Sequence, residues 1–166
     1  LTRIPVRVEL ASEFRYRNPI LDPEGLVVIV SQSGETADSL AALREAKQRG
    51  IRTLGIVNVV GSSIAREADN VFYTLAGPEI SVATTKAYST QLIASYALAV
   101  PFGTVREQIT EEKYQELIAE LKTLPDKIAK IIEDDKERIQ WFAAKQANAR
   151  DAFFIGRGID YAISME

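Results

Sequence analysis

Neither cysteine nor histidine occurs among the 166 residues of this chain. Without cysteine there is no thiol nucleophile and no disulfide framework, and without histidine the chain cannot build a Ser-His-Asp triad from its own residues. Zinc sites made of cysteine and histidine are excluded for the same reason. The side chains left for chemistry are carboxylates, lysines, tyrosines and hydroxyls, and we expect no metal and no cofactor.

The chain also lacks a charged and then apolar leader at its start, and it has no apolar run of about 18 residues that could span a bilayer. We therefore expect no membrane partner and a cytoplasmic location. The formal net charge of -3 argues against nucleic acid as a partner, because phosphate backbones are held mainly by concentrated lysine and arginine. A small acidic ligand remains compatible with this composition.

Short apolar runs alternate with helical patterns in the first hundred residues. Three β-branched runs predict buried parallel strands, at residues 26–30, 53–57 and 71–75. Between them the spacing predicts a helix over residues 35–49, ended by Gly50, and a helical turn at residues 63–68. This order predicts a parallel sheet with helices on both faces, the doubly wound arrangement of an α/β fold.

Further patterns flank this region. Residues 6–10 alternate like a half-buried strand, and residues 11–16 predict a short helix. Residues 84–100 predict a long, mostly buried helix that Pro101 stops. Two amphipathic helices with solvated, ion-paired faces are expected on either side of Pro125, followed by an apolar strand at residues 152–155. The chain starts at Leu1 and stops within residues 160–166, so we expect a segment cut at both ends.

Residues 31–36, Ser-Gln-Ser-Gly-Glu-Thr, join the first predicted strand to its helix. Ligands of doubly wound sheets lie at such strand ends. The first turn of a helix offers unpaired N–H groups and partial positive charge, and hydroxyls add donors that rotate toward phosphate oxygens. Because the segment is neither a P-loop nor a Gly-x-Gly-x-x-Gly fingerprint, a nucleotide is disfavoured. The residues leave two interpretations open, an anion site or a Ser33 that merely caps the helix.

Residues 31–38, Ser-Gln-Ser-Gly-Glu-Thr-Ala-Asp, resemble the phosphosugar-binding loop of sugar isomerase (SIS) domains. Residues 11–17, 61–63, 77–88 and 154–158 are in addition similar to the isomerase region of glucosamine-6-phosphate synthases, also called glutamine:fructose-6-phosphate amidotransferases. The resemblance implies a three-layer αβα SIS-type sheet, truncated and followed by a helical connector. It places a first SIS subdomain without its N-terminal strand at residues 1–103, the connector at 104–148, and the start of a second SIS subdomain at 149–166.

The resemblance also implies a phosphosugar ligand, fructose 6-phosphate or glucosamine 6-phosphate. The residues implied to hold the sugar phosphate are Ser31, Gln32, Ser33 and Thr36, and those implied to line the sugar are Val82, Ala83 and Thr84. Gly34 would let the backbone approach the ligand, and Lys86 matches a family lysine to which we assign no role; a structural lysine at a helix start is the alternative. Ser81 stands where the family usually has glycine, so this chain departs from the family in the backbone conformations that are open to this position.

No catalytic residue is expected in this chain. In the family, the proton-moving glutamate, the ring-opening histidine and the Schiff-base lysine follow the part that corresponds to this chain, and the glutamine-hydrolysing domain precedes it. The resemblance thus implies the phosphosugar-binding part of a homodimeric aminotransferase and ketose–aldose isomerase, which makes glucosamine 6-phosphate from fructose 6-phosphate and glutamine-derived ammonia. We expect the chain alone to be inactive. The alternatives are a non-catalytic SIS sensor of phosphosugars and a stand-alone phosphosugar isomerase.

Overall fold

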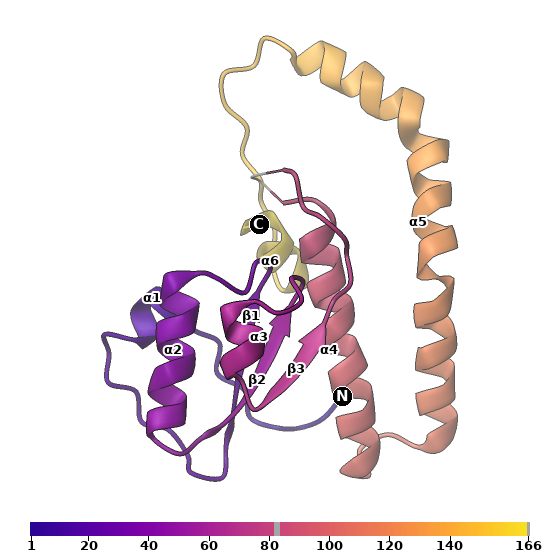
Figure 1. Ribbon diagram of the computed structural model, residues 1–166. Coiled ribbons are helices and arrows are strands. Elements are labelled where there is room, and N and C mark those ends of the chain that lie inside the picture. Colours follow the sequence, from indigo (N-terminus) through magenta and orange to yellow (C-terminus); the bar gives the residue numbers. More distant parts are fainter. Residues whose placement is uncertain (82–83, 166) are drawn as a thin grey trace. The chain divides into compact units, whose positions relative to one another are not determined.

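The computed structural model describes residues 1–81 and 84–165. The chain forms two compact units, Leu1–Ile118 and Ala119–Glu166. The first unit contains the sheet and the helices that cover it (Figure 1). In its described part, the second unit consists of helix and irregular chain.

Three parallel strands form the sheet of the first unit, in the order β1-β2-β3. Their bounds are β1 (Leu26–Ser31), β2 (Arg52–Val57) and β3 (Asn70–Tyr73). The register pairs Val28 with Leu54, and Gly55 with Val71. The first two strands lie where the β-branched runs predicted them, and the third overlaps its predicted range but ends at Tyr73 rather than at residue 75. The α/β class with a parallel sheet is confirmed.

Helices α2 (Ala37–Gln48) and α3 (Ser63–Glu67) follow the first two strands and pack on one face of the sheet, together with α1 (Ala11–Phe14). The core on this face consists of Ile29, Ala42, Leu43, Val57 and Ile64. Helix α2 ends as predicted, because Gly50 takes a φ of 75°, which glycine adopts without a Cβ penalty. It begins at Ala37 rather than at residue 35.

The opposite face of the sheet is covered unevenly. Leu54 and Ile56 of β2 point to that face and are 8% and 2% exposed, so β2 is covered on both sides. In Figure 1 the sheet lies between α2 and α4 (Lys86–Val105). On β1, however, Val28 and Val30 are 42% and 47% exposed. The prediction that this strand is covered on both faces was wrong, because the face of β1 that carries Val28 and Val30 is left exposed by the described part of the chain.

Helix α4 continues through Pro101 to Val105, so the prediction that Pro101 stops it was wrong. A proline inside a helix removes one backbone donor and crowds the preceding turn. Val100 and Gly103, on either side of Pro101, are both buried, and their packing holds the helix together across this cost. The helix is less buried than predicted, because Leu92 and Tyr96 are 42% and 52% exposed.

Helix α5 (Glu111–Gln146) is a single helix with Pro125 inside it. The prediction of two helices separated by this proline was therefore wrong. Lys127 Nζ lies 2.5 Å from Glu120 Oε2, an ion pair that spans the turn in which Pro125 removes one backbone donor. The expected solvated face is present, because the ion pairs on α5 are exposed and none of its residues is buried.

The two outermost predicted strands are irregular chain instead. Residues 6–10 and 152–155 make no ladder, and Val8 and Phe153 are 89% and 91% exposed. Alternating or apolar residues give a strand only when a neighbouring strand bonds to their N–H and C=O groups. The chain ends in α6 (Ile159–Met165).

Within residues 1–81 and 84–165, no helix is both long and apolar enough to cross a bilayer. The same described residues contain no group of three or more acidic, histidine or cysteine side chains that could hold a metal ion.

Candidate anion-binding site

The loop between β1 and α2, residues 31–36, lies at the carboxyl end of the sheet. Its backbone is tied to the residue that follows β2, because Asn58 N donates to Gln32 O over 3.0 Å. The Asn58 side chain then reaches the chain after β3: its Oδ1 accepts from Thr74 Oγ1 at 3.1 Å and from Ala76 N at 2.7 Å. Asn58 thus joins the ends of all three strands. Asn58 was not among the predicted site residues, although an asparagine directly after a buried strand could have signalled this role.

Three hydroxyl groups lie in this loop. Ser31 is 7% exposed, and its Oγ accepts from Gly34 N at 3.1 Å and lies 3.4 Å from Thr36 Oγ1. Thr36 is the N-cap residue of α2, yet its side chain makes no capping bond. Ser33 Oγ accepts from Glu35 N at 3.2 Å, within the turn that precedes the helix. The interpretation that Ser33 caps α2 is therefore wrong, and the Thr36 hydroxyl remains beside the free N–H groups of the first turn.

Gly34 is required at its position for two reasons. Its φ is 67°, which a residue with a Cβ adopts only at a cost. In addition, a Cβ there would stand 2.1 Å from Ser62 Oγ and 2.6 Å from Ser62 Cβ. The Gly34 backbone lies directly against the Ser62 side chain, with no room for a side chain of its own. Ser62 itself is 2% exposed, and its Oγ has no hydrogen-bond partner among the described residues.

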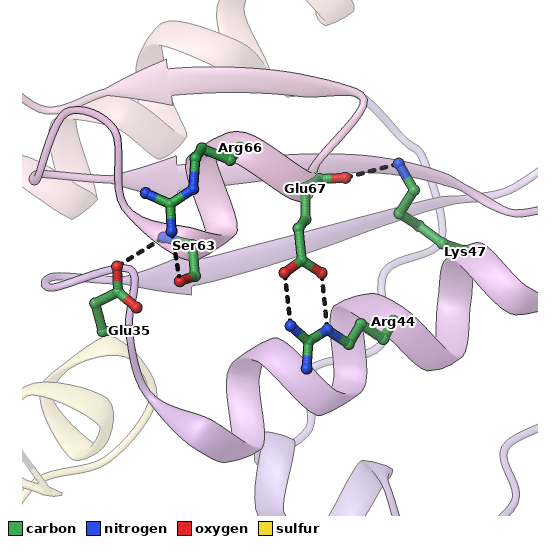
Figure 2. Close-up of polar contacts among 6 residues, drawn as sticks. All are labelled: Glu35, Arg44, Lys47, Ser63, Arg66 and Glu67. Atoms are coloured by element: carbon green, nitrogen blue, oxygen red, sulfur yellow. Dashed lines mark hydrogen bonds and ion pairs between the residues drawn. The ribbon is translucent and has the colours of Figure 1, made fainter.

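The same loop bonds to the start of α3. Glu35 Oε1 accepts from Ser63 N at 2.7 Å, as drawn in Figure 2, and Gly34 O accepts from Ile64 N at 3.0 Å. The hydrogen bonds from Ser63 lower the pKa of the Glu35 carboxyl below its ordinary value. Arg66 secures the other side of this turn, because its guanidinium donates to Gly61 O and, over 3.1 Å, to Ser63 Oγ.

A second polar cluster in Figure 2 joins α2 to α3 farther from the loop. Arg44 donates from Nε and Nη2 to the two carboxylate oxygens of Glu67, over 2.8 and 2.6 Å. This bidentate contact lowers the pKa of Glu67 and raises that of Arg44. Lys47 Nζ donates to Glu67 O over 2.6 Å. The cluster fixes α3 against α2, and α3 in turn supports the loop.

The remaining predicted site residues are only partly placed. Val82 and Ala83 lie outside the described residues. Thr84 has a φ of 59°, and its N donates to Ser81 O over 3.3 Å, while Lys86 is the first residue of α4. Among the described residues, no hydrogen bond or ion pair joins Thr84 or Lys86 to the loop of residues 31–36.

Taken together, the loop offers neutral donors at the start of a helix. Rotatable hydroxyls and first-turn N–H groups hold an anion without a cation, and the glycine keeps the backbone free of a side chain that would intrude. The described residues of this loop include no paired acid and base. The arrangement is therefore suited to binding an anionic group rather than to proton transfer.

Comparison with known proteins finds curated relatives that match this chain over nearly its whole length. The chain is 57% identical over 164 residues to a glutamine–fructose-6-phosphate aminotransferase (isomerizing) of Caldanaerobacter subterraneus subsp. tengcongensis, which covers 99% of this chain and 27% of the relative. It is 54% identical to the Clostridium tetani protein of the same name, covering 100% of this chain and again 27% of the relative. The chain thus spans about a quarter of the length of these curated relatives.

A solved structure, the C-terminal domain of glucosamine-fructose-6-phosphate aminotransferase from Francisella tularensis, matches with a TM-score of 0.92 at 36% identity. The match covers 98% of this chain and 46% of that one. The family model of the SIS domain matches residues 1–101, which include the whole sheet and the loop of residues 31–36. The resemblance noted in the sequence is confirmed, and this chain belongs to the SIS domain family.

Proposed function

We propose that this chain binds the phosphate group of fructose 6-phosphate or glucosamine 6-phosphate, as part of the isomerase region of a longer aminotransferase. The observation that carries the proposal is the placement of the Ser31 and Thr36 hydroxyls 3.4 Å apart at the start of α2. Neither hydroxyl is consumed by capping the helix. In this proposal Ser31, Gln32, Ser33 and Thr36 hold the phosphate, and Val82, Ala83 and Thr84 line the sugar.

The whole reaction would need groups from outside this chain. Conversion of fructose 6-phosphate to glucosamine 6-phosphate requires an acid–base group that moves a proton between neighbouring carbons and a source of ammonia. The proposed organisation is a first SIS subdomain at residues 1–103, a connector at 104–148 and the start of a second SIS subdomain at 149–166. We further propose that the longer protein is a homodimer that acts in the cytoplasm.

Two measurements test this function. The first is formation of glucosamine 6-phosphate from fructose 6-phosphate and glutamine, assayed with the full-length protein that carries this chain and with the chain alone. We expect turnover by the full-length protein and none by the chain. A full-length protein that binds the phosphosugar without turning it over would favour the sensor instead.

The second measurement is binding by the full-length protein, with fructose 6-phosphate and unphosphorylated fructose compared in calorimetric titrations. Phosphate supplies the charge-assisted hydrogen bonds, so fructose 6-phosphate should bind and fructose should not. Equal binding of the two sugars would remove the phosphate from the proposal.

A further inference from the structure

We propose that Glu35 is a positioning residue of the anion loop: it caps α3 from a distance and thereby holds residues 31–36 in their ligand-binding arrangement, without contacting the phosphate. The proposal rests on the function proposed above and names how its site is maintained.

The start of α3 is capped by the anion loop rather than by its own N-cap residue. Ser62 occupies the N-cap position, where serine ordinarily bonds to the second or third N–H of the helix, but its side chain makes no capping bond. The N–H groups of Ser63 and Ile64 instead donate to Glu35 Oε1 and Gly34 O, over 2.7 and 3.0 Å. The carboxylate that caps α3 thus belongs to a residue 28 positions earlier in the chain.

The unusual position of Ser62 explains why the cap comes from elsewhere. Its buried Oγ faces Gly34, with no hydrogen-bond partner in the described residues, and the two residues are in such close contact that a Cβ at position 34 would overlap that oxygen. The loop and the α3 start therefore behave as one packed piece. If the loop moved away, it would leave the first N–H groups of α3 without their acceptors.

The charge of Glu35 gives this role further support. A carboxylate in a loop that receives phosphate is electrostatically unfavourable, because the two negative charges repel each other. The Glu35 carboxylate is directed to Ser63 N, on the helix start, where negative charge is stabilised. In this role Glu35 acts as a hydrogen-bond acceptor, and an uncharged glutamine side chain can accept the same hydrogen bond.

Four variants of the full-length protein separate this role from a direct one. Glu35→Ala removes the acceptor, and Glu35→Gln keeps it without the charge. Ser63→Pro removes the donor at the first helical position, where proline is tolerated; Ser62, with φ -61° and ψ 163°, already has the conformation that precedes proline. Ser63→Ala keeps the N–H and loses the hydroxyl with its hydrogen bond from Arg66, both of which Ser63→Pro also loses, so the comparison of these two variants isolates the N–H.

The readouts are the dissociation constants of fructose 6-phosphate and inorganic phosphate, and the KM and kcat of turnover. We expect Glu35→Ala and Ser63→Pro each to raise the dissociation constants of both ligands and the KM by about tenfold, which is the effect of one lost hydrogen bond to a charged group. The kcat of each variant should stay within about twofold of the unchanged protein. Glu35→Gln and Ser63→Ala should stay within about threefold of the unchanged protein, and the double variant Glu35→Ala/Ser63→Pro should be no weaker than either single one.

Several results would overturn the proposal. One is a Glu35→Gln variant as impaired as Glu35→Ala, which would mean that the charge itself acts. Others are an unchanged Glu35→Ala, or additive losses in the double variant. If Glu35→Ala does not fold, the comparison of Ser63→Pro with Ser63→Ala decides. If phosphate binds and the variants change its affinity as expected but there is no turnover, the proposed function is contradicted and the role of Glu35 stands. If neither fructose 6-phosphate nor phosphate binds, both proposals are contradicted.

Discussion

Gly34 and Ser62 are packed so closely that a Cβ at position 34 would stand 2.1 Å from the Ser62 hydroxyl oxygen. This contact joins the anion loop to the start of α3 and requires a glycine whose φ is 67°. Two separate costs, backbone strain and steric overlap, therefore fall on any other residue at this position.

Replacement of this glycine should be much more harmful than replacement of a comparable one. Gly50→Ala, at a φ of 75° with no heavy atom within 4 Å of the added Cβ, should lower the free energy of unfolding by about 1–2 kcal/mol through backbone strain alone. Gly34→Ala should lower the free energy of unfolding by the same amount from strain and by about 1–3 kcal/mol more from overpacking against Ser62. Urea unfolding of both variants measures the difference. Adding Ser62→Gly to Gly34→Ala should recover the second part, and equal losses at the two glycines would contradict the contact.

Substitutions of the loop hydroxyls should weaken phosphosugar binding. Ser33→Ala and Thr36→Ala should each reduce the affinity for fructose 6-phosphate roughly tenfold or more, because each removes a donor to a charged group. Thr36→Ser should keep most of the affinity, and Lys86→Met should matter less than either alanine variant. Ligand titrations followed by NMR amide shifts, or by calorimetry, provide the measurement. Unchanged hydroxyl variants with a weakened Lys86→Met would move the phosphate to residues 77–86.

Acid should destabilise the first unit through Asp69. Its carboxylate pairs with Lys47 Nζ at 2.7 Å and accepts from Thr53 N and Thr53 Oγ1 at 2.9 and 2.8 Å, which lower its pKa from 3.8 to about 2. Since the pKa is lower in the folded state, the stabilisation is complete above the ordinary value of 3.8 and is lost as the pH falls toward 2. Unfolding measured from pH 5 to 2 should depend less steeply on pH in Asp69→Asn and Lys47→Met. Identical slopes in all three proteins would contradict this assignment.

The bidentate contact between Arg44 and Glu67 should contribute only modestly to stability. The Arg44 side chain is 55% exposed, so solvent screens the pair. A double-mutant cycle with Arg44→Ala and Glu67→Ala should give the small coupling free energy that is typical of exposed ion pairs. We expect 0.5 M salt to reduce this coupling free energy. The Debye length is already only about 10 Å at 0.1 M salt and is shorter at the higher concentration. A coupling that salt does not change would mean that the pair is more dehydrated than its exposure indicates.

Short stretches of sequence were sufficient to locate the elements whose local pattern agrees with their environment in the fold. The three β-branched strands, the helix ended by Gly50 and the loop of residues 31–36 were all located correctly, because a buried run, a left-handed glycine and a hydroxyl-rich turn each reflect a physical preference of a few neighbouring residues. The SIS family was recognisable from the same loop. Catalytic groups of the longer protein stay predictions, as do the ligand-binding roles of all the assigned site residues.

Tertiary structure decided what depends on partners distant in the chain. Whether Val6–Leu10 becomes a strand depends on a neighbour to bond with, and whether Pro101 or Pro125 ends a helix depends on packing and ion pairs around it, not on the proline alone. Likewise, no pattern near Glu35 reveals that it caps a helix 28 positions later, or that Ser62 leaves this task to it. Hydrogen bonds between separate loops are set by the three-dimensional arrangement of the backbone, which local propensity does not encode.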